Sequence, residues 1–253
     1  MLKVIAIHSF RGGTGKSNIT ANIALMIAST GKRVGIVDSD LQSPGIHVLF
    51  GLEQNDLQHT LNNYLWEQCT LKDVVYDVTP NAIKARNGMI VLAPGSYKID
   101  EITRIVQEGY DITTLGVAVN QMAEDWELDY LFVDTHPGIS NESIMTMGLS
   151  DILLTVMRPD NQDFQGTAVA VDISRHLDIP ARWIIVNKVL SAMHPAQVKA
   201  TVEKTYDTPV AALLPASDDL MLLGSAGLFC IKHPQHPFTE GIKQVARILI
   251  NHS

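Results

Sequence analysis

Arg11-Gly12-Gly13-Thr14-Gly15-Lys16-Ser17 is the stretch that decides the fold of this chain. It follows a short apolar run at residues 4–7 and opens a segment, residues 17–28, whose apolar side chains recur at helical spacing. A strand, a glycine-rich turn and a helix N-terminus in this order form a phosphate cradle, because backbone N–H groups at the turn point at the bound anion. The sequence therefore predicts a nucleotide site near the start of the chain.

The residue types of this loop suit that chemistry. Glycines let the backbone approach phosphate oxygens without a clashing Cβ. Lys16 supplies a cation for the terminal phosphates, and the Ser17 hydroxyl can bind Mg²⁺. A glycine-rich turn that contains a lysine by chance is the alternative, and the flanking strand and helix patterns argue against it. We expect nucleotide contacts from Gly12, Gly13, Thr14, Gly15, Lys16, Ser17 and Asn18.

The loop departs from the ordinary phosphate-loop pattern at Phe10, where that pattern has a glycine. Two consecutive glycines preceded by a basic residue resemble the deviant Walker A loop of the MinD/ParA family of ATPases, within the P-loop NTPase superfamily. Where that family has a signature lysine, this chain has Arg11. Arginine keeps the positive charge and adds a planar group that can bind phosphate through two donors.

Length and composition limit the possible classes of protein. A chain of 253 residues can bury a large core, and no linker-like segment divides it, so one domain over residues 1–253 is expected. A net charge of −8 and a pI near 5.5 argue against a broad basic surface for DNA or anionic lipid. The N-terminal apolar run is too short for a signal peptide, so a cytoplasmic location is expected.

The two cysteines, Cys69 and Cys230, lie far apart in the sequence. They lack the paired spacing that is typical of a zinc or iron–sulfur site. This spacing disfavours the iron–sulfur reductase branch of the superfamily.

Short apolar runs alternate with helical patterns along the chain. This alternation predicts an α/β fold, a doubly wound, mostly parallel sheet flanked by helices. The predicted strands are residues 4–7, 34–37, 89–92, 130–133, 152–156, 183–186 and 210–214. The predicted helices are residues 17–28, 57–66, 101–107, 112–122, 164–176, 195–204 and 238–251. Because such sheets bind ligands at the carboxyl ends of their strands, the residues after each strand are the candidates for chemistry.

Carboxylates follow two of these strands. Asp38 and Asp40 come after residues 34–37, and Asp134 ends the run at residues 130–133. A carboxylate beside a phosphate site can order Mg²⁺ and its waters or orient an attacking water. The family resemblance implies that Asp38 and Asp134 lie near the metal with Ser17, and that Asp40 positions the hydrolytic water. The alternative is that Asp38 and Asp40 cap an ordinary turn.

Three further residues follow these motifs in the same order as their counterparts in the family. The resemblance implies that the N–H of Gly138 senses the terminal phosphate, that Asn187 reads the adenine edge, and that the backbone around Pro215 completes the base pocket. A side-chain amide both donates and accepts, as base recognition requires. His136, in the same loop as Gly138, is either a proton carrier or an ordinary hydrogen-bonded loop histidine.

Taken together, the resemblance implies an ATP-dependent sandwich dimer that uses ATP and Mg²⁺, with a residue of each loop reaching the partner's phosphates. The expected catalytic residues are Arg11, Lys16, Asp40 and Gly138. We expect slow or partner-stimulated ATP hydrolysis that positions or partitions a cellular cargo. The alternatives are a nucleotide-switched adaptor with little turnover, which Arg11 motivates, and a phosphotransferase, for which no acceptor site is recognisable.

The sequence gives fewer signals about the cellular surface, membrane or DNA, to which such an ATP-driven dimer would bind. The last predicted helix places Phe238, Ile242, Val245 and Leu249 on one face, which favours packing on the sheet over a membrane anchor. The lysines and arginines are scattered among acids, so nonspecific DNA binding is only weakly supported. An unidentified protein partner or activator is expected.

Overall fold

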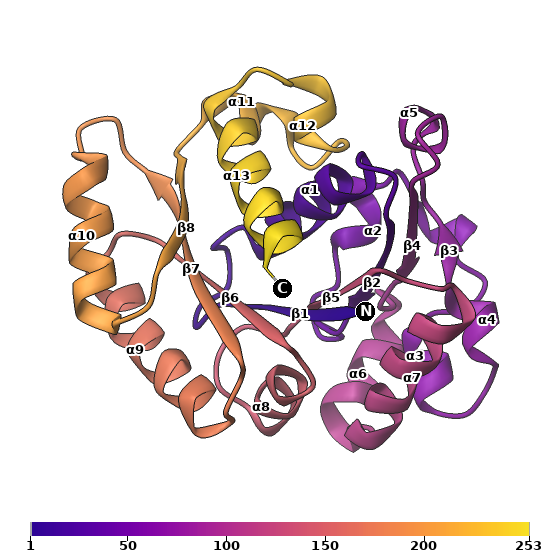
Figure 1. Cartoon of the computed structure of the whole chain (residues 1–253). Helices are drawn as coiled ribbons and strands as arrows, with labels where there is room; N and C mark the ends of the chain where they lie inside the picture. Colours follow the sequence, from indigo (N-terminus) through magenta and orange to yellow (C-terminus); the bar gives the residue numbers. More distant parts are fainter. Residues whose placement is uncertain (1, 253) are drawn as a thin grey trace.

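The computed structural model describes residues 2–252, through which one eight-stranded sheet runs (Figure 1). The strand order is β3-β4-β2-β5-β1-β6-β7-β8. The strands are β1 (Lys3–His8), β2 (Arg33–Asp38), β3 (Tyr76–Asp77), β4 (Met89–Ala93), β5 (Tyr130–Asp134), β6 (Ile152–Met157), β7 (Ala181–Val189) and β8 (Val210–Pro215). Neighbouring strands pair in parallel, except that β3 pairs antiparallel with β4 at one edge. The predicted mostly parallel, doubly wound sheet is confirmed.

Helices connect the strands and cover both faces of the sheet (Figure 1). They are α1 (Lys16–Ala28), α2 (Ile46–Leu49), η1 (Gln54–Asp56), α3 (Leu61–Leu65), α4 (Leu71–Val74), α5 (Asn81–Lys84), α6 (Ile99–Glu108), α7 (Ile112–Asp125), α8 (Asn141–Gly148), α9 (Asn161–His176), α10 (Pro195–Tyr206), α11 (Asp218–Leu223), α12 (Phe229–Lys232) and α13 (Pro237–Asn251). Helices α1 and α13 pack on one face, and α7, α8 and α9 pack on the other. Within residues 2–252, each helix is too short or too polar to cross a bilayer.

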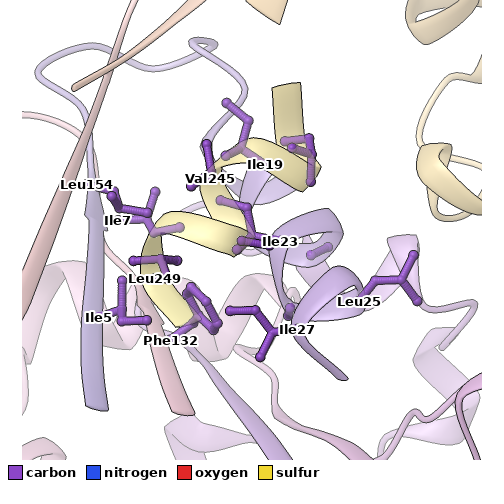
Figure 2. Packing of buried hydrophobic residues seen from close by; sticks show 14 of the residues in the cluster. Ile5, Ile7, Ile19, Ile23, Leu25, Ile27, Phe132, Leu154, Val245 and Leu249 are labelled. Atoms are coloured by element: carbon purple, nitrogen blue, oxygen red, sulfur yellow. The ribbon is translucent and has the colours of Figure 1, made fainter. Parts of the chain in front are cut away.

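Alternation along the strands divides the core between the two faces. Ile5 and Ile7 of β1 belong to the cluster with α1 and α13, whereas Val4 belongs to the cluster with α7. Figure 2 shows α13 packed on the face of the sheet that α1 also covers. Its Leu249 and Val245 lie among the side chains of the strands. This double-sided burial explains why the strands read as continuous apolar runs in the sequence.

Helix α13 buries the apolar face that the sequence predicted. Phe238, Ile242, Val245 and Leu249 each have an exposed fraction of 0%. A helix face that is fully covered by the sheet and by α1 has no apolar surface left at these positions for a membrane. The prediction of a helix packed on the sheet is confirmed.

One predicted helix is shorter in the structure. The pattern over residues 57–66 predicted a single helix, but α3 begins only at Leu61. The Thr60 N–H donates to the side-chain carbonyl of Asn63 at 2.9 Å, which caps the helix start. Leu57 is nevertheless buried, so an irregular segment supplied part of the apolar pattern.

The sheet register brings three strand ends to the same level. Asp134 at the end of β5 lies opposite Ile7 of β1 on one side and opposite Asp38 of β2 on the other. The chain then passes from β5 on one side of β1 to β6 on its other side. Crevices for ligands form where strand order diverges in this way, at the carboxyl ends of the strands.

Candidate nucleotide-binding site

The loop between β1 and α1 borders a cavity at the helix N-terminus. Its backbone has positive φ at Gly13 (74°) and Gly15 (96°), a conformation that glycine adopts without strain. A Cβ on Gly15 would lie 2.6 Å from Nδ2 of Asn187, so a larger residue would not fit. The cavity measures about 240 Å³, and its lining is Gly12, Gly13, Thr14, Gly15, Lys16, Ser17, Asn18, Asp40, Ser43 and Pro137. The structure thus brings together all the loop residues that were predicted to contact nucleotide.

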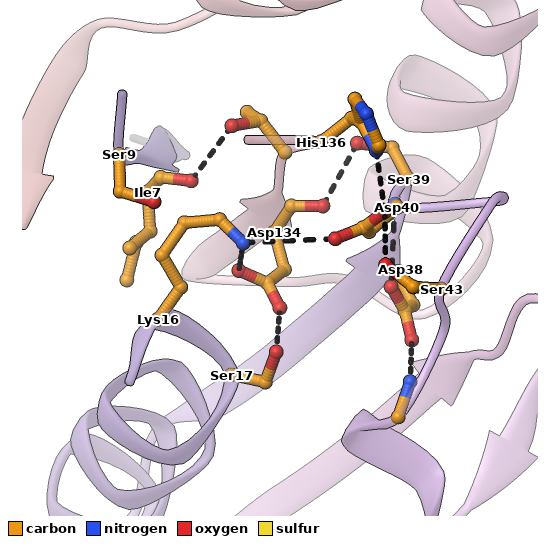
Figure 3. A network of polar contacts seen from close by, with 12 residues as sticks. Ile7, Ser9, Lys16, Ser17, Asp38, Ser39, Asp40, Ser43, Asp134 and His136 are labelled. Atoms are coloured by element: carbon orange, nitrogen blue, oxygen red, sulfur yellow. Dashed lines mark hydrogen bonds and ion pairs between the residues drawn. The ribbon is translucent and has the colours of Figure 1, made fainter. Parts of the chain in front are cut away.

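Lys16, which lines this cavity, lies between two carboxylates (Figure 3). Its Nζ is 3.8 Å from Oδ2 of Asp40 and 3.8 Å from Oδ1 of Asp134. All three side chains are buried. Because buried charges interact strongly, the ammonium group has a defined position from which to meet an incoming phosphate.

Ser17 and Asp134 together suit a magnesium ion. The Ser17 hydroxyl donates to Oδ2 of Asp134 at 2.6 Å, and Thr20 contacts the other carboxylate oxygen. Hydroxyl and carboxylate oxygens are ligands that Mg²⁺ prefers, with phosphate oxygens and waters completing its shell. Burial raises the pKa of Asp134, against the opposing effect of Lys16. A bound cation favours the ionised carboxylate, so this donor set fits the metal.

Asp38 is held by the backbone of its own loop. Its carboxylate accepts from the N–H groups of Asp40 at 3.3 Å, Gly45 at 3.1 Å and Ile46 at 3.3 Å. Burial raises the pKa of Asp38, and the nearby charges of Asp134 and Asp40 raise it further. The turn-capping role that the sequence left open is therefore present at Asp38, and its place near the metal stays a prediction.

Asp40 lines the cavity and accepts from two side chains. The Ser43 hydroxyl donates to Oδ1 of Asp40 at 3.1 Å, and Nδ1 of His136 lies 2.6 Å from the same oxygen. A carboxylate only accepts, so the imidazole nitrogen donates. Of the two possibilities for His136, the structure contains the hydrogen bond, and its partner is the carboxylate predicted to position water.

Arg11 contacts α9. Its guanidinium hydrogen-bonds the side chain of Gln162 and lies 3.8 Å from Oδ1 of Asp163. The neighbouring Phe10 ring lies against Gly166, where a Cβ would be 1.9 Å from the ring. The first residues of the loop are thus packed on α9, and the reach of Arg11 to a partner's phosphates stays a prediction.

Gly138 and Asn187 both contact the phosphate loop. Gly138 has a φ of 85°, and its N–H donates to the Ser9 carbonyl at 3.0 Å. The Asn187 side chain donates to the Thr14 carbonyl at 2.7 Å. Asn187 therefore braces the loop in this structure, and its reading of an adenine edge stays a prediction, as does phosphate sensing by Gly138.

Pro215 ends β8 beside the last residue of β7. Val189 of β7 pairs with Pro215 and accepts from the N–H of Ala216 at 2.9 Å. This places the Pro215 segment beside the end of β7 that carries Asn187, among the carboxyl ends of the strands. Its part in a base pocket stays a prediction.

Sequence reasoning missed one contact to the loop. Lys188 was counted among scattered surface cations, but its Nζ donates to the Gly13 carbonyl at 2.8 Å. Its backbone has a φ of 58°, which is unusual for a residue other than glycine and coincides with an irregularity in the pairing of β7 with β8 between Val186 and Val189. The available signal was its position directly after Asn187 at a predicted strand end.

The strand order, the glycine-rich loop and the clustered carboxylates define a nucleotide-binding protein of the P-loop class. A family model described as "ParA: NUBPL iron-transfer P-loop NTPase" matches residues 1–249. The chain belongs to this family, and the MinD/ParA-type resemblance stated from its motifs is confirmed.

Individual relatives agree with this assignment. An uncharacterized ATP-binding protein of Methanocaldococcus jannaschii is 27% identical over 251 residues, which cover 99% of this chain and 88% of that protein. The flagellum site-determining protein YlxH of Helicobacter pylori is 27% identical over 264 residues, covering 98% of this chain and 82% of that one. The septum site-determining protein MinD of Pyrococcus horikoshii, solved with Mg-ADP, has the same fold, with a TM-score of 0.83, 19% identity and coverage of 99% and 97%.

The two cysteines do not form a thiol pair that could hold iron. Cys230 lies in the core cluster of α1 and α13, and burial raises the pKa of its thiol to about 11. Cys69 packs against the cluster on the opposite face of the sheet, and burial raises its pKa as well. Metal ligation requires thiolates that lie close together. These residues therefore do not fit an iron or iron–sulfur site within one chain.

Proposed function

We propose that this protein binds ATP with Mg²⁺ and hydrolyses it slowly in an ATP-dependent homodimer, and that the nucleotide cycle positions or partitions a cellular cargo. The observation that carries the proposal is the placement of Lys16, which lines the cavity before α1, between Asp40 and Asp134. A triphosphate, its metal and an attacking water require these three kinds of group together.

Binding rests on the loop and the helix N-terminus. Unpaired N–H groups at the start of α1 and the positive end of the helix dipole attract the phosphates. Lys16 adds a full positive charge, and Asn187 and Lys188 hold the loop from the end of β7. The adenine would lie toward Asn187 and Pro215, at the same edge of the sheet.

Hydrolysis requires a metal and an oriented water. Ser17 and Asp134 would hold Mg²⁺, with Asp38 behind them, and the metal would neutralise charge that develops on the phosphate oxygens. Asp40 lines the cavity, so its carboxylate is available to accept a hydrogen bond from water and to aim it at the terminal phosphate. Gly138 would bind that phosphate once its N–H leaves Ser9.

Dimerisation would bring Arg11 into use. Its side chain is 40% exposed and comes from the loop that borders the cavity, so a second subunit facing this edge of the sheet lies within its reach. Arginine supplied in trans stabilises transition-state charge in phosphoryl transfer.

A nucleotide-switched adaptor with little turnover is the second candidate. The contacts of Arg11 with Gln162 and Asp163, and of Gly138 with Ser9, favour it because both groups are engaged within the subunit. In such a protein, ATP would rearrange these contacts and so create or remove a binding surface, without rapid hydrolysis.

Substitution of Lys16 and Asp40 tests the assignment of roles. Lys16→Ala should weaken ATP binding by roughly 100-fold or more, because it removes the main cation of the cradle. Asp40→Ala should bind ATP, lose turnover and accumulate as an ATP-bound dimer. The measurements are calorimetric titration with ATP and light scattering of the complexes. Lys204→Ala, which removes an exposed lysine of α10, is the matched control.

Unchanged ATP affinity in the Lys16→Ala variant would refute the assignment of the cradle. ATP-dependent partner binding that survives Asp40→Ala, in a protein without measurable turnover, would favour the adaptor over the enzyme.

A further inference from the structure

His136 and Asp40 meet because their strands are in register. Asp38 of β2 lies opposite Asp134 of β5, and Asp40 and His136 each come two residues later. The pairing continues past the strands, since the Ser39 N–H donates to the Asp134 carbonyl at 3.0 Å. The two loops therefore leave the sheet side by side, and their side chains come into contact.

The two oxygens of Asp40 have different surroundings (Figure 3). Oδ1 accepts from Nδ1 of His136, at 2.6 Å, and from the hydroxyl of Ser43, at 3.1 Å. Oδ2 is the oxygen that faces Lys16, at 3.8 Å. Oδ1 thus has two donors already, and Oδ2 is free to accept from a water molecule beside Lys16.

His136 acts on Asp40 from outside the cavity. Within the described residues, the cavity lining includes Asp40 and Ser43 and does not include His136. The imidazole is 26% exposed, whereas the Asp40 side chain is 9% exposed. His136 is therefore placed to orient the carboxylate, and it is not placed to touch the phosphates.

From this arrangement we infer that His136 is a positioning residue for ATP hydrolysis. Its Nδ1–H fixes the rotation of the Asp40 carboxylate, so that Oδ2 is presented to the attacking water. The same hydrogen bond joins the loop that carries Asp40 to the loop that carries Gly138. The inference rests on the proposed ATPase function and adds to it a residue, a named oxygen and a link between two loops.

Measurements of kcat and of the Kd for ATP distinguish a positioning role of His136 from a merely structural one. His136→Leu should lower kcat by about tenfold or more, as removal of an orienting hydrogen bond does elsewhere, and leave the Kd for ATP within about twofold. His136→Asn keeps an N–H donor near the position of Nδ1, and it should restore kcat to within about threefold of the native value. His176→Leu, at an exposed histidine of α9, is the matched control and should change neither quantity.

A second readout needs no turnover. In ¹⁵N-histidine-labelled protein without nucleotide, the His136 resonances, identified by their loss in His136→Asn, should show a protonated Nδ1. Asp40→Ala removes the acceptor, and the proton should then move to Nε2. An unprotonated Nδ1 in the native protein would overturn the inference, as would a native kcat in His136→Leu. If the native protein has no turnover at all, the proposed enzyme fails, and the NMR result still decides whether His136 orients Asp40.

Discussion

His8 is a fully buried histidine at the end of β1. Its Nδ1 lies 2.8 Å from the hydroxyl of Thr135, in the loop that follows β5. Burial lowers the pKa of His8 to about 3, and the charges of Lys16 and His136 contribute in the same direction. The side chain is thus neutral in the folded protein at neutral pH.

This lowered pKa predicts a loss of stability in mild acid. The unfolded chain binds a proton at His8 below pH 6.5, whereas the folded chain does so only near pH 3. The contribution of His8 to the free energy of unfolding therefore falls as pH drops below 6.5, by about 2 kcal/mol at pH 5. Urea unfolding at pH 7 and pH 5 should show a loss about 2 kcal/mol larger in the native protein than in His8→Asn.

The exposed His176 provides the control for this prediction, because His176→Asn should keep the native dependence on pH. Equal losses in the native protein and His8→Asn would contradict the account of His8. The native protein has to be compared with His8→Asn at both pH values. The raised pKa values of Asp38 and Asp134 change the free energy of unfolding in the opposite direction over this pH range.

At the scale of residues, the sequence predicted which side chains gather at the site better than it predicted what they touch. Asn187 follows a strand, so its place at the ligand edge could be inferred from the sheet alone. Its contact with the Thr14 carbonyl depends on how far the loop extends over β7, which no local pattern encodes. The same is true of Arg11, whose contact with Gln162 joins positions that are 151 residues apart.

At the scale of elements, α9 carries a glycine whose absent side chain makes room for the phosphate loop. A Cβ at Gly166 would lie 1.9 Å from the Phe10 ring. Phe10 stands where the ordinary phosphate loop has a glycine, so the bulk that the loop gained is accommodated by a small residue on the neighbouring helix. Gly166 thus explains how this departure from the usual pattern is compatible with the fold.

Replacement of Gly166 should be unfavourable although alanine is the better helix former. Gly166→Ala gains about 1 kcal/mol in helix propensity and loses about 1–3 kcal/mol through crowding against Phe10. We expect a net loss of about 1 kcal/mol in urea unfolding. Gly116→Ala in α7 is the matched control, because its Cβ would meet Leu149 at an ordinary 3.4 Å, and it should stabilise the protein by about 0.5–1 kcal/mol. Stabilisation by both variants would contradict the proposed packing of Phe10.

The seven parallel strands could be predicted because each is a buried apolar run between helical patterns. Strand β3 could not, because Tyr76–Asp77 is too short to show a pattern. Helix α8 was missed because its segment is only weakly apolar. Its signal was local, since Ser140 and Ser143 exchange hydrogen bonds at the helix start.

At the scale of the whole molecule, the site lies at the carboxyl ends of the central strands of the sheet. The cavity is bordered by the loops after β1, β2 and β5. The loop after β2 is also tied to the core, because Leu41, directly after Asp40, is buried in the cluster that contains α7.

ATP turnover per subunit, measured with Mg²⁺ and without any partner over a wide range of protein concentration, tests the central claim most directly. Hydrolysis within an ATP-dependent dimer predicts a turnover number that rises with concentration and then levels off as the dimer saturates. The rise would also show that Arg11 supports the activity for which the family uses a signature lysine. A turnover number that is constant down to the lowest concentration, or absent at every concentration, would contradict hydrolysis in a dimer.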